Sequence, residues 1–167
     1  MIVTICRKYG SGGKEIGRLL ALRLGVPFYD ADLAPEGSEE ARFGAIRALA
    51  DQGPCVIVGF CADHILAGRE GLIRVFIHCD MDRRVERIVH QYGLARPLAA
   101  REALHQDRER ARLYGFYTGG KWADLSRYDL TVDSGPLGIA GTVELLSQFV
   151  ALKVMRRRGA KEGTALF

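Results

Sequence analysis

The sequence predicts an α/β fold in which parallel strands alternate with helices. Short apolar runs, rich in β-branched residues, recur along the chain, and most are apolar on both faces, which is typical of a parallel sheet covered on both sides. Helical patterns separate these runs, so right-handed crossovers should connect the strands. The expected strands span residues 2–6, 27–29, 55–59, 73–79 and 128–132.

The helices are expected over residues 13–24, 38–52, 62–67, 82–92, 97–117 and 137–157. Two helix starts are well marked. Ser38 is followed by two acidic residues, which complement the helix dipole, and Asp82 is expected as an N-cap. From residue 156 onward the apolar periodicity is lost. We therefore expect one domain over residues 1–157 and a flexible tail over residues 158–167.

The composition is that of a soluble globular domain, with 167 residues, 48% hydrophobic and 26% charged. Neither a run of about 18 apolar residues nor a signal-peptide pattern is visible, so a cytoplasmic protein without a membrane partner is expected. The four cysteines lack metal-ligand spacing, which favours reduced buried thiols and no structural metal. The net charge of +4 leaves a nucleic-acid-binding domain as a minor alternative, but acidic residues are interleaved with the arginines of residues 83–127.

The chain begins with the parts needed to hold a phosphate chain: an apolar run, a glycine loop, a lysine and an amphipathic helix. Glycines allow backbone N–H groups to converge on an anion, and the helix N-terminus adds its positive dipole end. Lys14 adds a full charge and is a candidate catalytic residue. The residues expected to bind the phosphates of a donor are Gly10, Ser11, Gly12, Gly13, Lys14, Glu15 and Ile16.

This loop departs from the standard phosphate-loop pattern GxxxxGK[ST]. The position five residues before Gly13 is Lys8, and neither Glu15 nor Ile16 offers the hydroxyl that usually holds Mg²⁺. Mg²⁺ would then be held by substrate phosphates and one carboxylate, for which Asp30 and Asp63 are the candidates and Glu15 a weaker one. The alternative is a glycine-rich turn that binds no ligand.

Several blocks in one order resemble the cytidylate kinase-like branch of the P-loop nucleoside monophosphate kinases, and the resemblance covers nearly the whole chain. These blocks are YGSGGKEIGRLLALRLGVPFYD, CVIVGFCADHIL, RVFIHCDMDRRVERI, DRERARLYGFYTGGKW and YDLTVDSGPLG. The resemblance implies a three-layer P-loop NTPase fold with a five-stranded parallel sheet of order 2-3-1-4-5, helices on both faces, and a helical lid near residues 83–122. It also implies ATP as the donor, Mg²⁺, and a small-molecule acceptor.

The resemblance further suggests roles for arginines of the lid. Arg84, Arg87 and Arg110 match the lid arginines of the family and join Lys14 as candidate catalytic residues, with Asp107 orienting them. Arg108 is the substitute if the register differs. Phosphoryl transfer depends on positioning and charge neutralisation, which such a set of cations can supply. For any single arginine here, the alternative is a solvated helix surface with i,i+4 ion pairs.

On the acceptor side the resemblance points to Asp30, Asp63 and the segment after Gly59. The family usually has an arginine after that glycine, and this chain has Phe60, which cannot replace a bidentate cation. The acceptor region between Asp30 and the third strand is also shorter than in the family. Two functions therefore stay open: an ATP-dependent small-molecule kinase, or a catalytically impaired nucleotide- or phosphate-binding protein with a regulatory or interaction role.

Overall fold

The computed structural model describes residues 1–33, 37–59 and 61–161. Strands and helices alternate along the chain, as expected from the sequence. The strands are β1 (Ile2–Arg7), β2 (Phe28–Asp30), β3 (Cys55–Val58), β4 (Leu72–His78) and β5 (Leu130–Asp133). The helices are α1 (Gly13–Leu24), α2 (Glu39–Asp51), α3 (Ala62–Ile65), α4 (Met81–Tyr92), α5 (Arg96–Thr118) and α6 (Ser134–Lys161), with 3-10 turns η1 (Ala31–Leu33) and η2 (Leu125–Arg127).

The five strands form one parallel sheet of order β2-β3-β1-β4-β5, which confirms the predicted topology. The central strand β1 pairs on both sides, with Val3 opposite Val56 in β3 and opposite Ile73 in β4. Because all strands run in one direction, the loops that follow them gather along one edge of the sheet. That edge is where α/β proteins bind their ligands.

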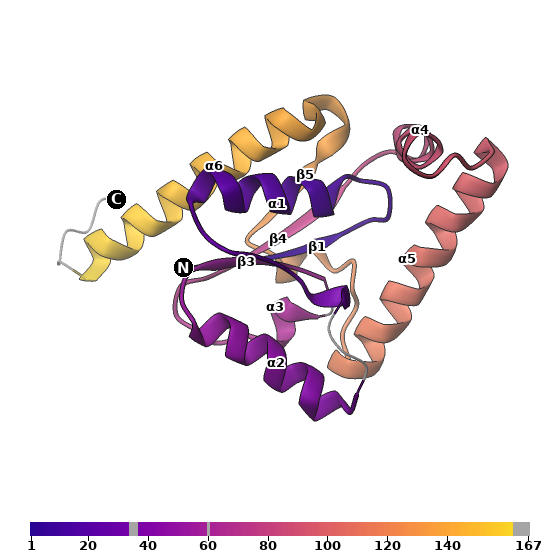
Figure 1. Cartoon of the computed structure of the whole chain (residues 1–167). Helices are drawn as coiled ribbons and strands as arrows, with labels where there is room; N and C mark the ends of the chain where they lie inside the picture. The colour runs from indigo at the N-terminus through magenta and orange to yellow at the C-terminus, as the bar shows by residue number, and fades with distance from the viewer. Residues whose placement is uncertain (34–36, 60, 162–167) are drawn as a thin grey trace.

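Helices cover both faces of the sheet, so the predicted three layers are confirmed (Figure 1). Helices α1 and α6 lie on one face, where Ile16 and Leu146 join Val3 in one buried cluster. Helices α2 and α3 lie on the other, where Ile46 packs in a second cluster with Ile2. Successive residues of β1 thus contribute to opposite clusters, as the alternation of strand side chains requires.

Helices α4 and α5 pack against each other beyond the carboxyl ends of the strands, in the region predicted as a lid (Figure 1). Val85 and Ile88 of α4 form a small separate core with Ala99 and Ala103 of α5. The alanines leave room for close approach of the two helices. Helix α5 is the longer of the two, and its C-terminal end approaches α2, where Tyr117 contacts Phe43 edge-on with ring centroids 5.7 Å apart (Figure 1).

Several helix boundaries differ from the predictions by one or more residues, those of α4 and α6 among them. Helix α4 begins one residue earlier, because Asp80 rather than Asp82 is its N-cap: the Asp80 carboxylate accepts the Arg83 N–H at 3.0 Å. Helix α6 begins at Ser134, has a non-helical residue at Gly138, and continues to Lys161. Residues 158–161 of the predicted tail are therefore helical, and residues 162–167 lie outside the described part of the chain.

Helix α6 also contains a long apolar stretch that the sequence prediction passed over. Within residues 134–159, an 18-residue window has a mean hydropathy of 1.4, which by length and composition alone would allow a membrane span. Core helices of soluble proteins have the same properties. Here Leu146 and Val150 are buried against the sheet and α1, so the apolar character of α6 serves at least in part to cover the sheet.

Candidate active site

The glycine loop leaves the carboxyl end of β1 and turns directly into α1. Gly10 and Gly12 have φ values of +77° and +80°, a region that residues with a Cβ rarely adopt. A Cβ at Gly10 would lie 2.9 Å from Ile88 Cδ1, and one at Gly12 would overlap Ile139. Ser11 is fully buried, and its hydroxyl donates to the Lys8 carbonyl at 2.7 Å. These contacts fix the loop tightly between α4 and α6.

The first turn of α1 presents unpaired donors at this point. Gly12 is the N-cap and provides no side-chain hydrogen bond, and the Ile16 N–H, which donates to Gly12 O at 2.9 Å, is the first to donate within the helix. The N–H groups of Gly13, Lys14 and Glu15 are therefore without intrahelical acceptors. Together with the helix dipole they form the geometry that binds phosphate. Of the expected loop residues, Ile16 alone belongs to the hydrophobic core.

A cavity of about 490 Å³ opens beside the loop. Its size lies within the usual range for small-molecule sites. Three carboxylates line it: Glu15, Asp30 and Asp32. Six cationic side chains line it as well, which gives the wall a formal excess of three positive charges: Arg7, Lys8, Lys14, Arg18, Arg87 and Arg110. Such a balance favours a ligand with several negative charges.

Lys14 and Asp30 face each other across this cavity. The Lys14 ammonium lies 2.7 Å from Asp30 Oδ2, although the lysine side chain is 60% exposed. The lysine comes from the start of α1, which follows β1, and the aspartate from the end of β2, with β3 between these two strands in the sheet. A phosphate on the loop would compete with Asp30 for this ammonium group.

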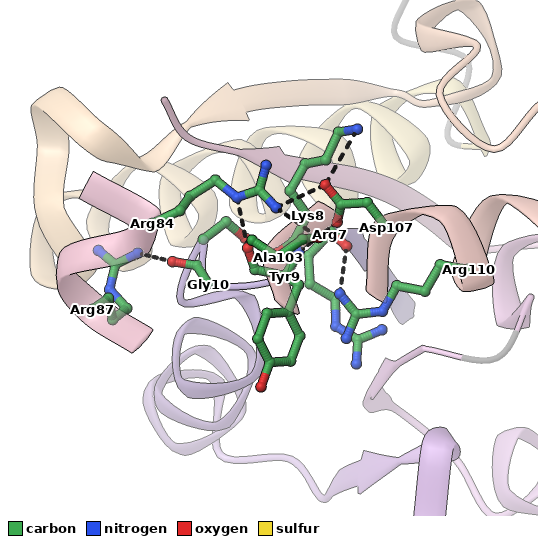
Figure 2. A network of polar contacts seen from close by, with 10 residues as sticks. Arg7, Lys8, Tyr9, Gly10, Arg84, Arg87, Ala103, Asp107 and Arg110 are labelled. Atoms are coloured by element: carbon green, nitrogen blue, oxygen red, sulfur yellow. Dashed lines mark hydrogen bonds and ion pairs between the residues drawn. The ribbon is translucent and has the colours of Figure 1, made fainter. Parts of the chain in front are cut away.

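The three predicted lid arginines all donate to the backbone around the loop (Figure 2). Arg84 Nε donates to Tyr9 O at 2.6 Å, and Arg87 Nη1 donates to Gly10 O at 2.6 Å, both from α4. From α5, Arg110 Nη1 donates to Arg7 O at 3.1 Å. The two helices are thus tied to the loop by contacts between residues 75 to 103 positions apart.

Asp107 lies at the centre of this network (Figure 2). It accepts the Tyr9 N–H at 2.9 Å and the Arg84 guanidinium at 2.7 Å, and the Lys8 ammonium is 3.6 Å away. Arg84 and Asp107 are both buried and do not line the cavity. Arg87 and Arg110 do line it. The structure therefore separates the predicted arginines into one beneath the loop and two that face a ligand.

Burial and like charge raise the energy of the Arg110 cation. Its pKa is lowered to about 10, first by burial and then by the nearby Arg7 guanidinium, while Asp32 and Asp107 oppose the shift. A guanidinium stays protonated at neutral pH even so. An anion bound between the two arginines would relieve their repulsion.

The other predicted acceptor residues lie elsewhere. Asp63, at 4% exposure, sits inside the protein, where it accepts the Tyr114 hydroxyl at 2.7 Å and the Cys6 thiol at 3.4 Å, and it does not line the cavity. Phe60 lies outside the described residues. Arg108 is exposed on α5 and does not line the cavity either.

The residues present fit a nucleotide polyphosphate better than a free metal ion. Loop N–H groups and cations converge on one cavity, whereas no group of three potential metal-ligating side chains occurs among the residues that the structure describes. Asp30 is already paired with Lys14. Mg²⁺ would therefore have to be held chiefly by nucleotide oxygens and water, with Glu15, Asp30 and Asp32 as the protein carboxylates on the cavity wall.

Sequence reasoning missed several cavity residues, among them Arg7, Arg18, Asp32 and the stacked pair Tyr9 and Tyr92, whose ring centroids are 6.3 Å apart. One signal was available for Arg7. It is the last residue of an otherwise apolar strand, immediately before the glycine loop, and charged residues at that edge of a parallel sheet tend to face the ligand. Asp32 and Tyr92 line the cavity because η1 and α4 fold back over the loop, whereas Arg18 lies on α1 and Tyr9 in the loop itself.

Comparisons with known proteins agree with this geometry. A sequence model of the cytidylate kinase-like family matches residues 2–45 and 39–136. A cytidylate kinase from Methanothrix thermoacetophila is 28% identical over 175 residues, which cover 92% of this chain and 100% of that protein. A solved structure of an uncharacterized protein from Eubacterium ventriosum is 27% identical with a TM-score of 0.84, covering 90% of this chain and 98% of the other.

More distant structures share the fold alone. The shikimate kinase of Bacteroides thetaiotaomicron superposes with a TM-score of 0.57 at 14% identity, covering 90% of this chain and 98% of that one. Its similarity therefore concerns the arrangement of sheet, loop and helices, which is that of a P-loop kinase.

Proposed function

Because the chain belongs to the cytidylate kinase-like family, we propose that it transfers the γ-phosphoryl group of ATP to a small-molecule acceptor. Family and fold support a kinase-like, nucleotide-binding role. The observation that carries the finer proposal is the position of Lys14: it starts α1 beside the open N–H groups and reaches across the cavity to Asp30. In this proposal Lys14 belongs to the donor site and Asp30 to the acceptor site, so their contact places the two sites next to each other.

In this proposal the N–H groups of Gly13, Lys14 and Glu15 hold the β-phosphate, and Lys14 leaves Asp30 to bridge the β- and γ-phosphates. Arg87 and Arg110 face the cavity and neutralise charge on the transferred group. When bound with the nucleotide, Mg²⁺ would further polarise its phosphate oxygens. The acceptor oxygen bonds to the γ-phosphorus as the bond to the β,γ-bridging oxygen breaks, and ADP leaves.

Asp30, once released by Lys14, is placed to accept a hydrogen bond from the acceptor hydroxyl or from a water on Mg²⁺. Its side chain is 9% exposed, so it is held in place by the end of β2 and by η1, whose Asp32 N–H donates to Asp30 Oδ1 at 3.2 Å. A carboxylate with a fixed position restricts the orientation of the bound acceptor. Orienting the reactants in this way is a large part of how a kinase accelerates phosphoryl transfer. Asp107 and Arg84 act as positioning residues that hold the loop.

We further propose that α4 and α5 close as a lid when the polyphosphate binds. Arg87 would then exchange its bond to Gly10 O for bonds to phosphate oxygens. Hydrogen exchange over residues 83–122 should slow when ATP is added. Exchange that is already slow without ATP and does not respond would mean that these arginines have a structural role only.

We propose a cytoplasmic location and small-molecule partners that are consistent with this activity. All four cysteines are buried without a disulfide, which suits a reducing compartment such as the cytoplasm, where ATP is also available. A nucleotide donor and a small acceptor are the proposed partners, and nucleic acid is not among them.

The test is a titration of the purified protein with ATP, with and without Mg²⁺, followed by a screen of candidate acceptors for a product heavier by one phosphoryl group. ATP binding and a phosphorylated product are expected. Absence of ATP binding would overturn the proposal. Strong salt-dependent binding of duplex DNA, with no response to ATP, would instead support a nucleic-acid-binding domain.

A catalytically impaired nucleotide-binding protein is the second candidate, and Phe60 is the observation that favours it. If catalysis was lost at this position alone, Phe60→Arg should create activity toward a nucleoside monophosphate. The affinity for this acceptor should rise by about ten- to hundred-fold. If the natural acceptor instead contacts Phe60, the same variant should lose activity toward that acceptor. ATP binding without product in either protein would favour the impaired alternative.

A further inference from the structure

Helix α6 carries apolar side chains on two opposite faces, and the sheet covers one of them. Val143, Leu146 and Val150 are buried in the cluster that also contains Val3 of β1. A helix that is apolar on all sides is normally enclosed by protein or by lipid. Only 28% of the most apolar 18-residue window of α6 is buried within the described chain. The fold itself therefore does not account for the apolar character of the exposed face.

The exposed apolar residues of α6 lie along one side of the helix. Leu145, Leu152 and Met155 are 40%, 59% and 66% exposed, and their spacing in the sequence places them on one helical face. Gln148 lies between them and is the polar member of the set. We call Leu145, Gln148, Leu152 and Met155 the exposed stripe.

Two basic side chains on the other side of α6 fix the rotation of the helix. Lys153 Nζ lies 3.2 Å from Asp129 Oδ1, and Arg157 Nη2 donates to Leu72 O at 2.8 Å. Both contacts are made with the sheet and its connections. The exposed stripe is therefore held facing away from the sheet.

Two exposed arginines, Arg156 and Arg158, flank the stripe. Each residue of an α-helix turns the chain by about 100°, so Arg156 lies about 40° to one side of Leu152 and Arg158 about 60° to the other side of Met155. No acidic residue occurs from residue 145 to residue 159. The face thus combines an apolar centre with positive charge on both sides.

We propose that this face of α6 binds the surface of a membrane that contains anionic lipids. Leu152 and Met155 enter the boundary between headgroups and acyl chains, and Arg156 and Arg158 extend their charged ends to the lipid phosphates. The helix lies in the plane of the membrane and does not cross it, because its other face covers the sheet. This inference is independent of the proposed kinase activity.

The place of the stripe in the fold leaves the candidate active site accessible. Helix α6 begins after β5, at the edge of the sheet where the glycine loop lies, and runs to the opposite edge, where Arg157 contacts the first residue of β4. Its last turns extend past the end of α1 (Figure 1). A chain bound to a membrane through these turns keeps the cavity beside the glycine loop open to solvent.

A second copy of this chain is the alternative occupant of the stripe. Two stripes packed against each other would bring together residues 145–159 of both copies, which contain no carboxylate to pair with Arg156 and Arg158. A membrane with anionic lipids supplies negative charge beside an apolar layer. Charge complementarity therefore favours the membrane.

The experiment measures sedimentation of the full chain with lipid vesicles. Vesicles of phosphatidylcholine alone are compared with mixed vesicles that contain equal parts of phosphatidylcholine and phosphatidylglycerol. The chain should bind the mixed vesicles about tenfold or more tightly. About 1 M NaCl should remove most of this preference, because the Debye length then falls to about 3 Å. Absence of binding to the mixed vesicles would overturn the inference.

Two double variants test the residues of α6. The variant with Leu152→Ser and Met155→Ser, and the variant with Arg156→Ser and Arg158→Ser, should each bind the mixed vesicles about tenfold or more weakly. All four side chains are exposed, so the unfolding temperature should change little.

Matched controls remove the same kinds of exposed side chain from α5. One carries Leu98→Ser and Leu104→Ser, and the other carries Arg101→Ser and Arg108→Ser. Both should bind the mixed vesicles as the wild type does. Equal losses in the α5 and α6 variants would mean that the chain adsorbs through its net charge alone, and the assignment to α6 would be wrong.

A spectroscopic variant reports whether the stripe enters the membrane. Met155→Trp adds a tryptophan to the stripe, and its emission should shift to shorter wavelength on mixed vesicles. Trp122, the natural tryptophan, is 5% exposed and gives a constant background. Vesicle binding without this shift would contradict the proposed insertion.

Sedimentation equilibrium without lipid tests the alternative occupant. The wild type and the variant with Leu152→Ser and Met155→Ser should have the same oligomeric state. A dimer that dissociates in this variant would identify a second copy as the occupant of the stripe and would rule out the membrane.

Discussion

Arg84 and Asp107 form a buried ion pair at 2.7 Å between α4 and α5, with side chains that are 5% and 10% exposed. The same carboxylate accepts the Tyr9 N–H, so one residue joins the two helices to the glycine loop. An ion pair of this kind costs more to break than it contributes as a unit, because removing one partner leaves the other charge buried and unpaired.

Replacing Asp107 should therefore be strongly destabilising. Asp107→Ala is expected to lower the free energy of unfolding by about 3–5 kcal/mol, because Arg84 would remain buried without its counter-ion. Glu109→Ala is the control: Glu109 pairs with Arg112 on the exposed surface of the same helix, where solvent screens the pair, and its loss should have little effect on stability. Denaturant unfolding measures both. Equal effects of the two variants would contradict the central role of Asp107.

Lys14→Ala should weaken ATP binding by about ten- to hundred-fold, because it removes a full positive charge from the cavity wall in the first turn of α1, beside the loop donors. The Lys14 side chain is 60% exposed, and Asp30, although only 9% exposed, borders the open cavity, so water can replace the ammonium group and the fold should be little affected. Isothermal titration of ATP gives the affinity, and Lys121→Ala, an exposed lysine beyond α5, serves as the control. Unchanged ATP affinity in Lys14→Ala would remove the proposed donor site.

Two glycines of similar helical position should respond in opposite directions to alanine. A Cβ at Gly17 in α1 would lie 2.6 Å from Val58 Cγ2, so Gly17→Ala should destabilise the fold by about 1–3 kcal/mol through overpacking. At Gly44 in α2 nothing lies within 4 Å, and Gly44→Ala should stabilise it by about 0.5–1 kcal/mol through helix propensity. Thermal unfolding distinguishes the two. A stabilising Gly17→Ala would mean that α1 does not pack on β3 at this distance.

Alkaline pH should reveal the burial of Cys61. Burial, with help from Asp63 and Asp32, raises the pKa of its thiol to about 12, against about 8.5 in an unfolded chain. Between these values the unfolded chain loses the proton and the folded one keeps it, so this residue's contribution is complete below about pH 8.5 and is lost as pH rises toward 12.

The measurement compares wild type with Cys61→Ala by urea unfolding at pH 8 and pH 10.5. The stability difference in favour of wild type should shrink at the higher pH, by at most about 1.4 kcal/mol per pH unit. A difference that is the same at both values would mean that the thiol ionises with its ordinary pKa in the folded protein.

Much of the fold could be predicted from local pattern. The strands are short apolar runs and the helices have amphipathic periodicity, so their existence and order were confirmed, with shifts of a few residues at their ends. The glycine loop was equally visible, because Gly10 and Gly12 stand where positive φ is required between a strand and a helix. The helix starts were less certain, as Asp80 and Asp82 are both acceptable N-caps by residue type, and only the geometry of the turn selects the first.

The sequence by itself thus determined the layers and the position of the glycine loop between a strand and a helix, because these depend on periodicity and on backbone requirements of single residues, and its family resemblance indicated the strand order. Only the tertiary structure determined which polar and charged side chains contact one another. Asp63 faces Tyr114 in the interior, Asp107 joins Arg84, and Arg7 lies beside Arg110, across separations of 51, 23 and 103 residues. Such partners depend on how helices pack at the edge of the sheet, and the alternation of polar and apolar residues along the chain carries no information about that.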